Sequence, residues 1–228
     1  LKETGTIIRS YPKQIKMPLG LLITEAAIRA GDVKFATNYL QVISEEEPTP
    51  KELDQLALVE GKLQQLAGDF DAAVEAWEAA AEGEHRPSVA EAILNRAELL
   101  LTTKKIETKE AIEELEGLRF SWRGGDFEFD VLRKLGRYYF DVQDFRNGLN
   151  TLRAAASYFR GHDLAPEVTK EMVTSFVDLY LNGAADVMQP VQAIALFDEF
   201  KELTPSGKRG DEMIRKLADR LAQVDLLD

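Results

Sequence analysis

Residues 135–156, LGRYYFDVQDFRNGLNTLRAAA, decide the fold of this chain. The stretch contains two amphipathic segments separated by Gln143-Asp144-Phe145, and Gly148 lies one turn into the second segment. Asp is a favoured helix N-cap, and a small residue lets two helices approach closely. The stretch therefore predicts two antiparallel helices joined by a tight turn.

The same pattern recurs along the whole chain. Gly31-Asp32-Val33 and Gly68-Asp69-Phe70 repeat the turn 37 residues apart. A small residue follows each predicted turn, and the set is Ala36, Ala73, Ala111, Gly148 and Ala193. The last interval is longer because an insertion occupies residues 182–190. A period in the thirties built from helix pairs predicts an α-solenoid, in which stacked pairs share one core.

Each pair also needs a first helix, which begins near a Pro in most copies. The predicted first helices are Pro18–Ala30, Pro50–Ala67, Pro87–Thr102, Phe129–Val142 and Pro166–Leu181. The predicted organisation is a lead-in at 1–17 and a single solenoid at 18–228. Its repeats are about 18–48, 50–85, 87–120, 127–162 and 166–205, with a final helix at about 211–226. That helix is interpreted as a cap or as half of a sixth repeat, and both ends of the chain look cut.

The chain resembles the tetratricopeptide repeat (TPR) family. Leu135-Gly136, Tyr139 and Ala155 follow the family's Leu-Gly…Tyr…Ala…Ala pattern, with Gly148 where Ala is usual. The resemblance implies an all-α, right-handed α-α superhelix of about five helix-turn-helix repeats plus a C-terminal helix. Residues 118–125 and 197–211 also resemble large uncharacterised TPR proteins of alphaproteobacteria. That implies a piece of a longer exported protein in the bacterial periplasm, with the cytoplasm as the alternative.

Composition argues against several functions. The net charge of −12 disfavours binding to nucleic acid and to anionic membranes. The chain has no Cys, and no apolar run is long enough to predict a membrane-spanning helix. His85 and His162 lie in polar turns and are interpreted as ordinary surface histidines. We therefore predict no catalytic residue, no metal site, no cofactor and no enzyme activity.

An aromatic cluster lies between the third and fourth repeats. It contains Phe120, Trp122, Phe127 and Phe129, interleaved with Arg119 and Arg123. One interpretation is a staple, in which these aromatics fill the groove between adjacent helix pairs. A second is an exposed binding hot spot at Phe120, Trp122 and Arg123, because Trp and Arg are enriched at interface centres. A third, base stacking, conflicts with the net charge.

The resemblance to TPR proteins implies that the first helices line a concave surface that holds the ligand. The predicted groove residues are Leu58, Lys62, Gln65, Leu94, Glu98, Leu101, Arg133, Arg137, Phe140 and Asp178. Only Lys62, Arg133 and Arg137 are basic, which disfavours a strongly basic clamp for a two-carboxylate peptide end.

The leading hypothesis is a scaffold or adaptor that binds a protein or peptide in this groove. The first alternative is a spacer or assembly component of a larger complex, such as one in the cell envelope. The second alternative is the non-catalytic arm of a larger enzyme. The partner, the pathway and the oligomeric state are not encoded in any motif of the chain.

Overall fold

The structure is a computed structural model that describes the backbone of residues 10–225. Within that range it describes all side chains except those of Val187, Leu221 and residues 223–225. Residues 1–9 of the predicted lead-in and Leu226 of the predicted final helix thus lie outside the described part of the chain.

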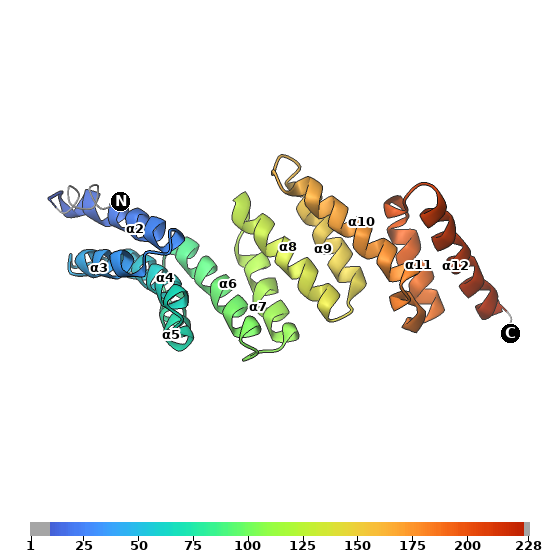
Figure 1. Cartoon of the computed structure of the whole chain (residues 1–228), viewed down its shortest axis with the longest axis horizontal. Helices are drawn as coiled ribbons and strands as arrows, with labels where there is room; N and C mark the ends of the chain where they lie inside the picture. The colour runs from blue at the N-terminus through green and yellow to red at the C-terminus, as the bar shows by residue number, and fades with distance from the viewer. Residues whose placement is uncertain (1–9, 226–228) are drawn as a thin grey trace. The chain divides into compact units, whose positions relative to one another are not determined.

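The described residues form eleven α-helices and two short 3-10 helices, and no strand occurs among them (Figure 1). The α-helices are α2 Lys13–Arg29, α3 Val33–Ser44, α4 Pro50–Ala67, α5 Phe70–Ala81, α6 Arg86–Thr102, α7 Thr108–Ser121, α8 Gly125–Asp141, α9 Phe145–Tyr158, α10 Ala165–Leu181, α11 Pro190–Glu199 and α12 Lys208–Asp225. The 3-10 helices are η1 Ala184–Val187 and η2 Lys201–Leu203. Consecutive helices pack in pairs from α2/α3 to α8/α9. The prediction of an all-α solenoid is confirmed.

The predicted Gly-Asp turns form as expected. Asp32, Asp69 and Asp144 each cap the second helix of a pair, and their side chains accept hydrogen bonds from the backbone N–H three residues on. The residue before each Asp has positive φ, +74° at Gly31, +86° at Gly68 and +62° at Gln143. Gly adopts this conformation without strain, and Gln143 shows that the turn also forms without Gly.

Small residues hold the two helices of a pair close together. Ala36, Ala73, Ala111 and Ala193 are fully buried. One such approach lies between α4 and α5, where a Cβ placed on Gly61 would be 2.3 Å from Nε1 of Trp77. The indole of Trp77 is fully buried and donates a hydrogen bond to the Leu58 carbonyl oxygen at 3.2 Å. The absence of a side chain at Gly61 therefore creates the space that Trp77 occupies.

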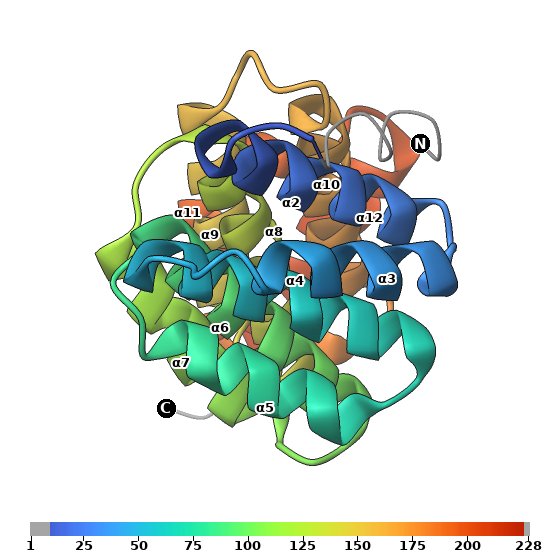
Figure 2. The ribbon, with the colours of Figure 1, turned by 90° about the vertical axis from the view of Figure 1, so that its left-hand side faces the viewer.

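The chain divides into two compact units, residues 1–122 and 123–228. In unit 1, α2 and α3 lie beside α4 and α5 (Figure 2). Its first core cluster joins α2, α3 and α4 through residues such as Met17, Tyr39, Ile43 and Leu56. A second cluster surrounds Trp77 and extends to α6. Each helix pair of unit 1 thus buries apolar surface against the next, as stacking repeats require.

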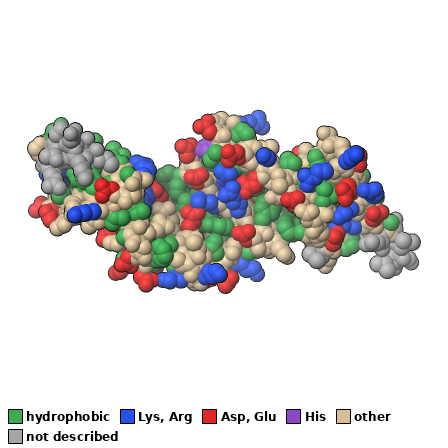
Figure 3. All heavy atoms as spheres, viewed as in Figure 1, with side chains coloured by type: hydrophobic (Ala, Val, Ile, Leu, Met, Phe, Trp, Pro, Cys, Tyr) green, Lys and Arg blue, Asp and Glu red, His purple; other side chains and the backbone are tan. Residues whose placement is uncertain are grey.

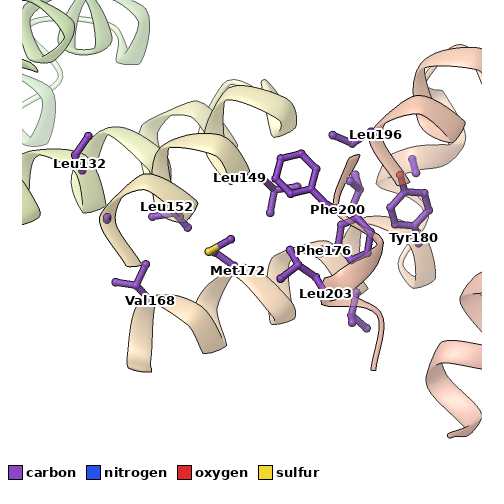
Figure 4. Close-up of a cluster of buried hydrophobic side chains, with 14 of the residues drawn as sticks. Leu132, Leu149, Leu152, Val168, Met172, Phe176, Tyr180, Leu196, Phe200 and Leu203 are labelled. Carbon is purple, nitrogen blue, oxygen red and sulfur yellow. The ribbon is translucent and has the colours of Figure 1, made fainter. Parts of the chain in front are cut away.

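In unit 2, one apolar cluster runs from α8 to α12 (Figure 4). Phe176 and Tyr180 of α10 make ring contacts with Phe197, which joins α10 to α11. The hydroxyl of Tyr180 also donates to the Ala193 carbonyl oxygen at 2.6 Å. The residue 182–190 insertion contains η1, and buried Arg220 of α12 donates to the Ala185 carbonyl oxygen at 2.6 Å. The insertion is therefore hydrogen-bonded to α12.

The predicted start of the first helix was wrong. Helix α2 begins at Lys13, five residues before Pro18, and Pro18 lies inside it. Pro cannot donate the backbone hydrogen bond of a helix interior, but Pro18 lies on an exposed face where water can bond the released carbonyl. Met17, which was placed in the lead-in, is instead 1% exposed in the core. The final helix likewise begins at Lys208, three residues earlier than expected.

Candidate partner-binding groove

An open groove of about 330 Å³ crosses the first helices of three successive pairs in unit 1. Helix α2 contributes Pro18, Leu21, Leu22 and Glu25, and α4 contributes Gln55, Leu58 and Val59. The N-terminal end of α6 completes the lining with His85, Pro87, Ser88 and Glu91. Leu22 is 58% exposed, and Pro18 and Pro87 of the lining are exposed as well. The groove thus combines an accessible apolar surface with carboxylates.

Asp54 fixes the α6 side of this groove. Its buried carboxylate accepts hydrogen bonds from the backbone N–H groups of Glu84 and His85, both at 2.7 Å. His85 then caps α6, because its Nδ1 accepts from the Ser88 backbone N–H at 3.4 Å. These bonds place the first turn of α6 beside α4. The sequence had suggested no role for Asp54.

Lys62 joins all three first helices next to the groove, although it is not one of the lining residues. Its Nζ lies 2.8 Å from Oε1 of Glu25 on α2 and 2.7 Å from Oε1 of Glu91 on α6. Burial alone would lower the pKa of Lys62, but its hydrogen bonds to Glu25 and Glu91 outweigh burial and raise the pKa. Lys62 therefore stays charged and holds the two carboxylates together.

The other predicted groove residues of unit 1 lie outside the groove lining. Leu94 is 6% exposed and lies outside the groove lining, as do the half-buried Glu98 and Leu101. Gln65 is exposed near the C-terminal end of α4. The α6 wall of the groove is therefore built from the first turns of that helix and not from its middle.

The predicted basic residues of unit 2 are paired with carboxylates. Arg137 of α8 contacts both carboxylate oxygens of Glu171 on α10, at 2.5 and 3.0 Å, and this hydrogen bonding raises the pKa of Arg137. Arg133 lies 3.4 Å from Glu167 and 3.5 Å from Glu171. Basic and acidic side chains accordingly lie side by side over α8 and α10 (Figure 3). The mixed-charge face predicted there consists of helix-to-helix ion pairs.

Two further predicted groove residues of unit 2 also have partners within the unit. Asp178 of α10 lies 3.7 Å from Arg209 of α12. Phe140 is half-buried and packs against the core next to Phe145. Both residues therefore support packing between elements of unit 2.

The aromatic cluster separates into residues with different environments. Phe120 is 79% exposed on α7, so the interpretation of all four aromatics as one buried staple is wrong. Trp122 is half-buried and lines a pocket of about 130 Å³ with Ile93 and Leu118. Phe129 is fully buried in unit 2. A hot spot at Phe120, Trp122 and Arg123 stays a prediction, although Arg123 is 3.1 Å from the buried carboxylate of Glu128.

The two histidines have structural roles, which corrects their interpretation as ordinary surface residues. His85 caps α6, and His162 stacks on Phe129 with 3.8 Å between ring centroids. Among the described residues, no group of three or more His, Asp or Glu side chains could hold a metal ion. None of the helices within residues 10–225 has the length and apolar character needed to cross a membrane.

A second concavity, of about 350 Å³, lies in unit 2 between α9 and α11. Phe145, Met188 and Leu196 provide its apolar surface, and Arg146 and Glu199 pair at its rim at 2.7 Å. Sequence reasoning missed this pocket because Met188 belongs to the insertion. No periodic pattern predicts where an insertion will lie.

Comparisons with known proteins agree with this architecture. No protein-family model matches the chain, and no curated protein sequence matches it. A similar solved structure is that of a Podosopora anserina protein, assigned to the kinesin light chains, with nearly identical TPR-like repeats. The TM-score is 0.55 at 14% identity, over 94% of this chain and 98% of that chain. Likeness at this identity shows the fold alone, so the chain is an all-α protein with a TPR-like repeat fold.

Proposed function

We propose that this chain is a protein-interaction scaffold that binds a short polypeptide segment in the groove formed by α2, α4 and α6. Solenoids of helix pairs commonly present extended concave surfaces to protein partners, and a TPR-like fold points to a non-catalytic scaffold. The observation that carries the proposal is the groove itself, an open concavity lined by three successive first helices with Leu22 exposed.

The first helices of unit 2 support this proposal less well. Arg133 and Arg137, the predicted basic anchors there, already bind Glu167 and Glu171. A ligand carboxylate would have to displace these glutamates before it could use either arginine. In unit 1, Leu22 is available without displacement of any side chain from an ion pair.

The size of the groove limits the length of the bound segment. Packed helices lie about 8–10 Å apart, so three successive first helices span about 16–20 Å. An extended chain advances about 3.3 Å per residue, so about five or six residues cross the groove. A short linear segment of a partner protein therefore fits the site better than a folded domain.

A displayed library of random peptides would test the proposal. We expect selection on the wild-type chain to yield peptides that bind Leu22→Lys at least about tenfold more weakly, because a charged side chain replaces apolar contact area. Leu53→Lys is the matched control, because Leu53 is 52% exposed on α4 and lies outside the groove lining. Failure to select any peptide, or peptides that bind Leu22→Lys as tightly as Leu53→Lys, would overturn the proposal.

A further inference from the structure

The groove of unit 1 consists of two parallel bands. Leu22, Leu58 and Pro87 form an apolar band, with one residue on each of α2, α4 and α6. Leu22 and Pro87 are exposed, whereas Leu58 is only 5% exposed. Glu25 and Glu91 line the groove and form a charged band together with Lys62, which contacts both from outside the lining. Each of the three lies three or four residues after its apolar counterpart. Three or four residues are one helical turn, so both members of a pair share a helix face. Alternate helices of antiparallel pairs run in the same direction, which continues each band across all three helices.

The charged band has an excess of negative charge. It contains two carboxylates and one ammonium group, and the ammonium is in contact with both carboxylates. The side chains of Glu25 and Glu91 are 27% and 40% exposed, so both can be reached from solvent. An acidic ligand would meet two carboxylates and a lysine that is already paired. A basic ligand would meet unbalanced negative charge in a half-buried setting, where attraction is stronger than in bulk water.

We propose that the groove selects an extended segment in which apolar and basic side chains alternate. This inference rests on the proposed function and specifies the chemistry of the partner. Successive side chains of an extended chain point to opposite sides. A segment that lies along the groove therefore directs one set of side chains to the apolar band and the other set to the charged band. Lys or Arg on the second side lies next to Glu25 and Glu91.

Four synthetic peptides separate charge from pattern. Each carries six variable residues between Gly-Ser flanks and a fluorescent label: alternating Leu and Lys, alternating Leu and Gln, alternating Leu and Glu, and three Leu followed by three Lys. Fluorescence polarisation measures their Kd for the wild-type chain. We expect the alternating Leu-Lys peptide to bind at least about tenfold more tightly than the Leu-Gln peptide and the block peptide, and the Leu-Glu peptide to bind most weakly.

Variants of the chain then locate the charge preference. Glu25→Gln/Glu91→Gln should bind the Leu-Lys and Leu-Gln peptides equally. Glu60→Gln/Glu75→Gln makes the same change in net charge at exposed positions outside the groove lining and should keep the preference. Because loss of both carboxylates leaves Lys62 without its contacts, circular dichroism checks that the variant is folded. The more exposed Glu91→Gln alone should lose part of the preference.

The outcomes for this inference and for the proposed function are distinguishable. Equal binding of the Leu-Lys and Leu-Gln peptides, both lost in Leu22→Lys, would overturn the charge preference and leave the groove as the binding site. A preference that survives in Glu25→Gln/Glu91→Gln would place the charge recognition elsewhere. If Leu22→Lys binds every peptide as tightly as the wild-type chain does, the proposed function itself is contradicted.

Discussion

Gly61→Ala should destabilise unit 1 even though alanine is the better helix former. The added Cβ would lie 2.3 to 2.7 Å from three atoms of the Trp77 indole, well inside contact distance. The indole is rigid and fully buried, so it can move only by disturbing the packing of α4 on α5. Overpacking of this kind costs about 1–3 kcal/mol, and loss of the bond from Trp77 to Leu58 costs about 1 kcal/mol more. The higher helix propensity of Ala offsets about 1 kcal/mol, so the free energy of unfolding should fall by about 2 kcal/mol in total.

Gly117→Ala is the matched control, because a Cβ at Gly117 in α7 would meet nothing within 4 Å. It should stabilise the chain by up to about 1 kcal/mol through helix propensity alone. The chain has two Trp, Trp77 and Trp122, so the substitutions are best compared in a Trp122→Phe background, in which Trp77 reports unfolding of unit 1. Urea titrations followed by Trp77 fluorescence would measure both effects. An unchanged or raised urea midpoint for Gly61→Ala would show that Trp77 does not depend on the space at Gly61.

Two further predictions concern single carboxylates. Asp54→Ala should lower the stability of unit 1 by about 2–4 kcal/mol in the same urea assay, because the N–H groups of Glu84 and His85 lose a charged acceptor. A loss of stability no greater than that of Asp54→Asn would contradict this prediction. Hydrogen bonds from Asn150 and then Arg146 lower the pKa of Glu199 in the folded state. The ionised Glu199 therefore stabilises the fold at a pH above its unfolded pKa of about 4.5, and this stabilisation is lost as the pH falls through the folded pKa. Glu199→Gln should therefore reduce the fall in thermal midpoint between about pH 6 and about pH 3, and an unchanged fall would show that the α9–α11 contact does not depend on this charge.

Local signals in the sequence were enough to predict most of the fold. An Asp after a tight turn caps a helix through its own side chain, which is a local effect. Small residues such as Ala73 likewise mark the close approach of two helices without reference to distant parts of the chain. The misplaced start of α2 has the opposite cause. A Pro is tolerated inside a helix when its missing hydrogen bond falls on the solvent side, and only the packing of Met17 shows which side that is.

The groove could be predicted only in part, because it depends on the register between helices. Leu58, which lines the groove, and Lys62, which lies next to it, both follow from the face of α4 that the TPR resemblance implies. The α6 wall uses Pro87 and Glu91 because Asp54 holds the first turn of α6 against α4, and that contact spans about thirty residues of sequence. The pairing of Arg137 with Glu171 was missed for the same reason, because the sequence of each helix contains the charged residue but does not indicate which residue it pairs with. The signal that could have suggested such pairs is opposite charges at positions 34 to 37 residues apart, which is about one repeat.

The contact between Arg220 and η1 joins two segments of the chain that are synthesised at different times. The Ala185 carbonyl oxygen accepts from Arg220, a residue translated 35 positions later. A ribosome releases the chain from its N-terminal end, so the α10–α11 connection emerges before the side chain that secures it. The Ala185 carbonyl oxygen can therefore accept this hydrogen bond only after Arg220 of α12 has left the exit tunnel.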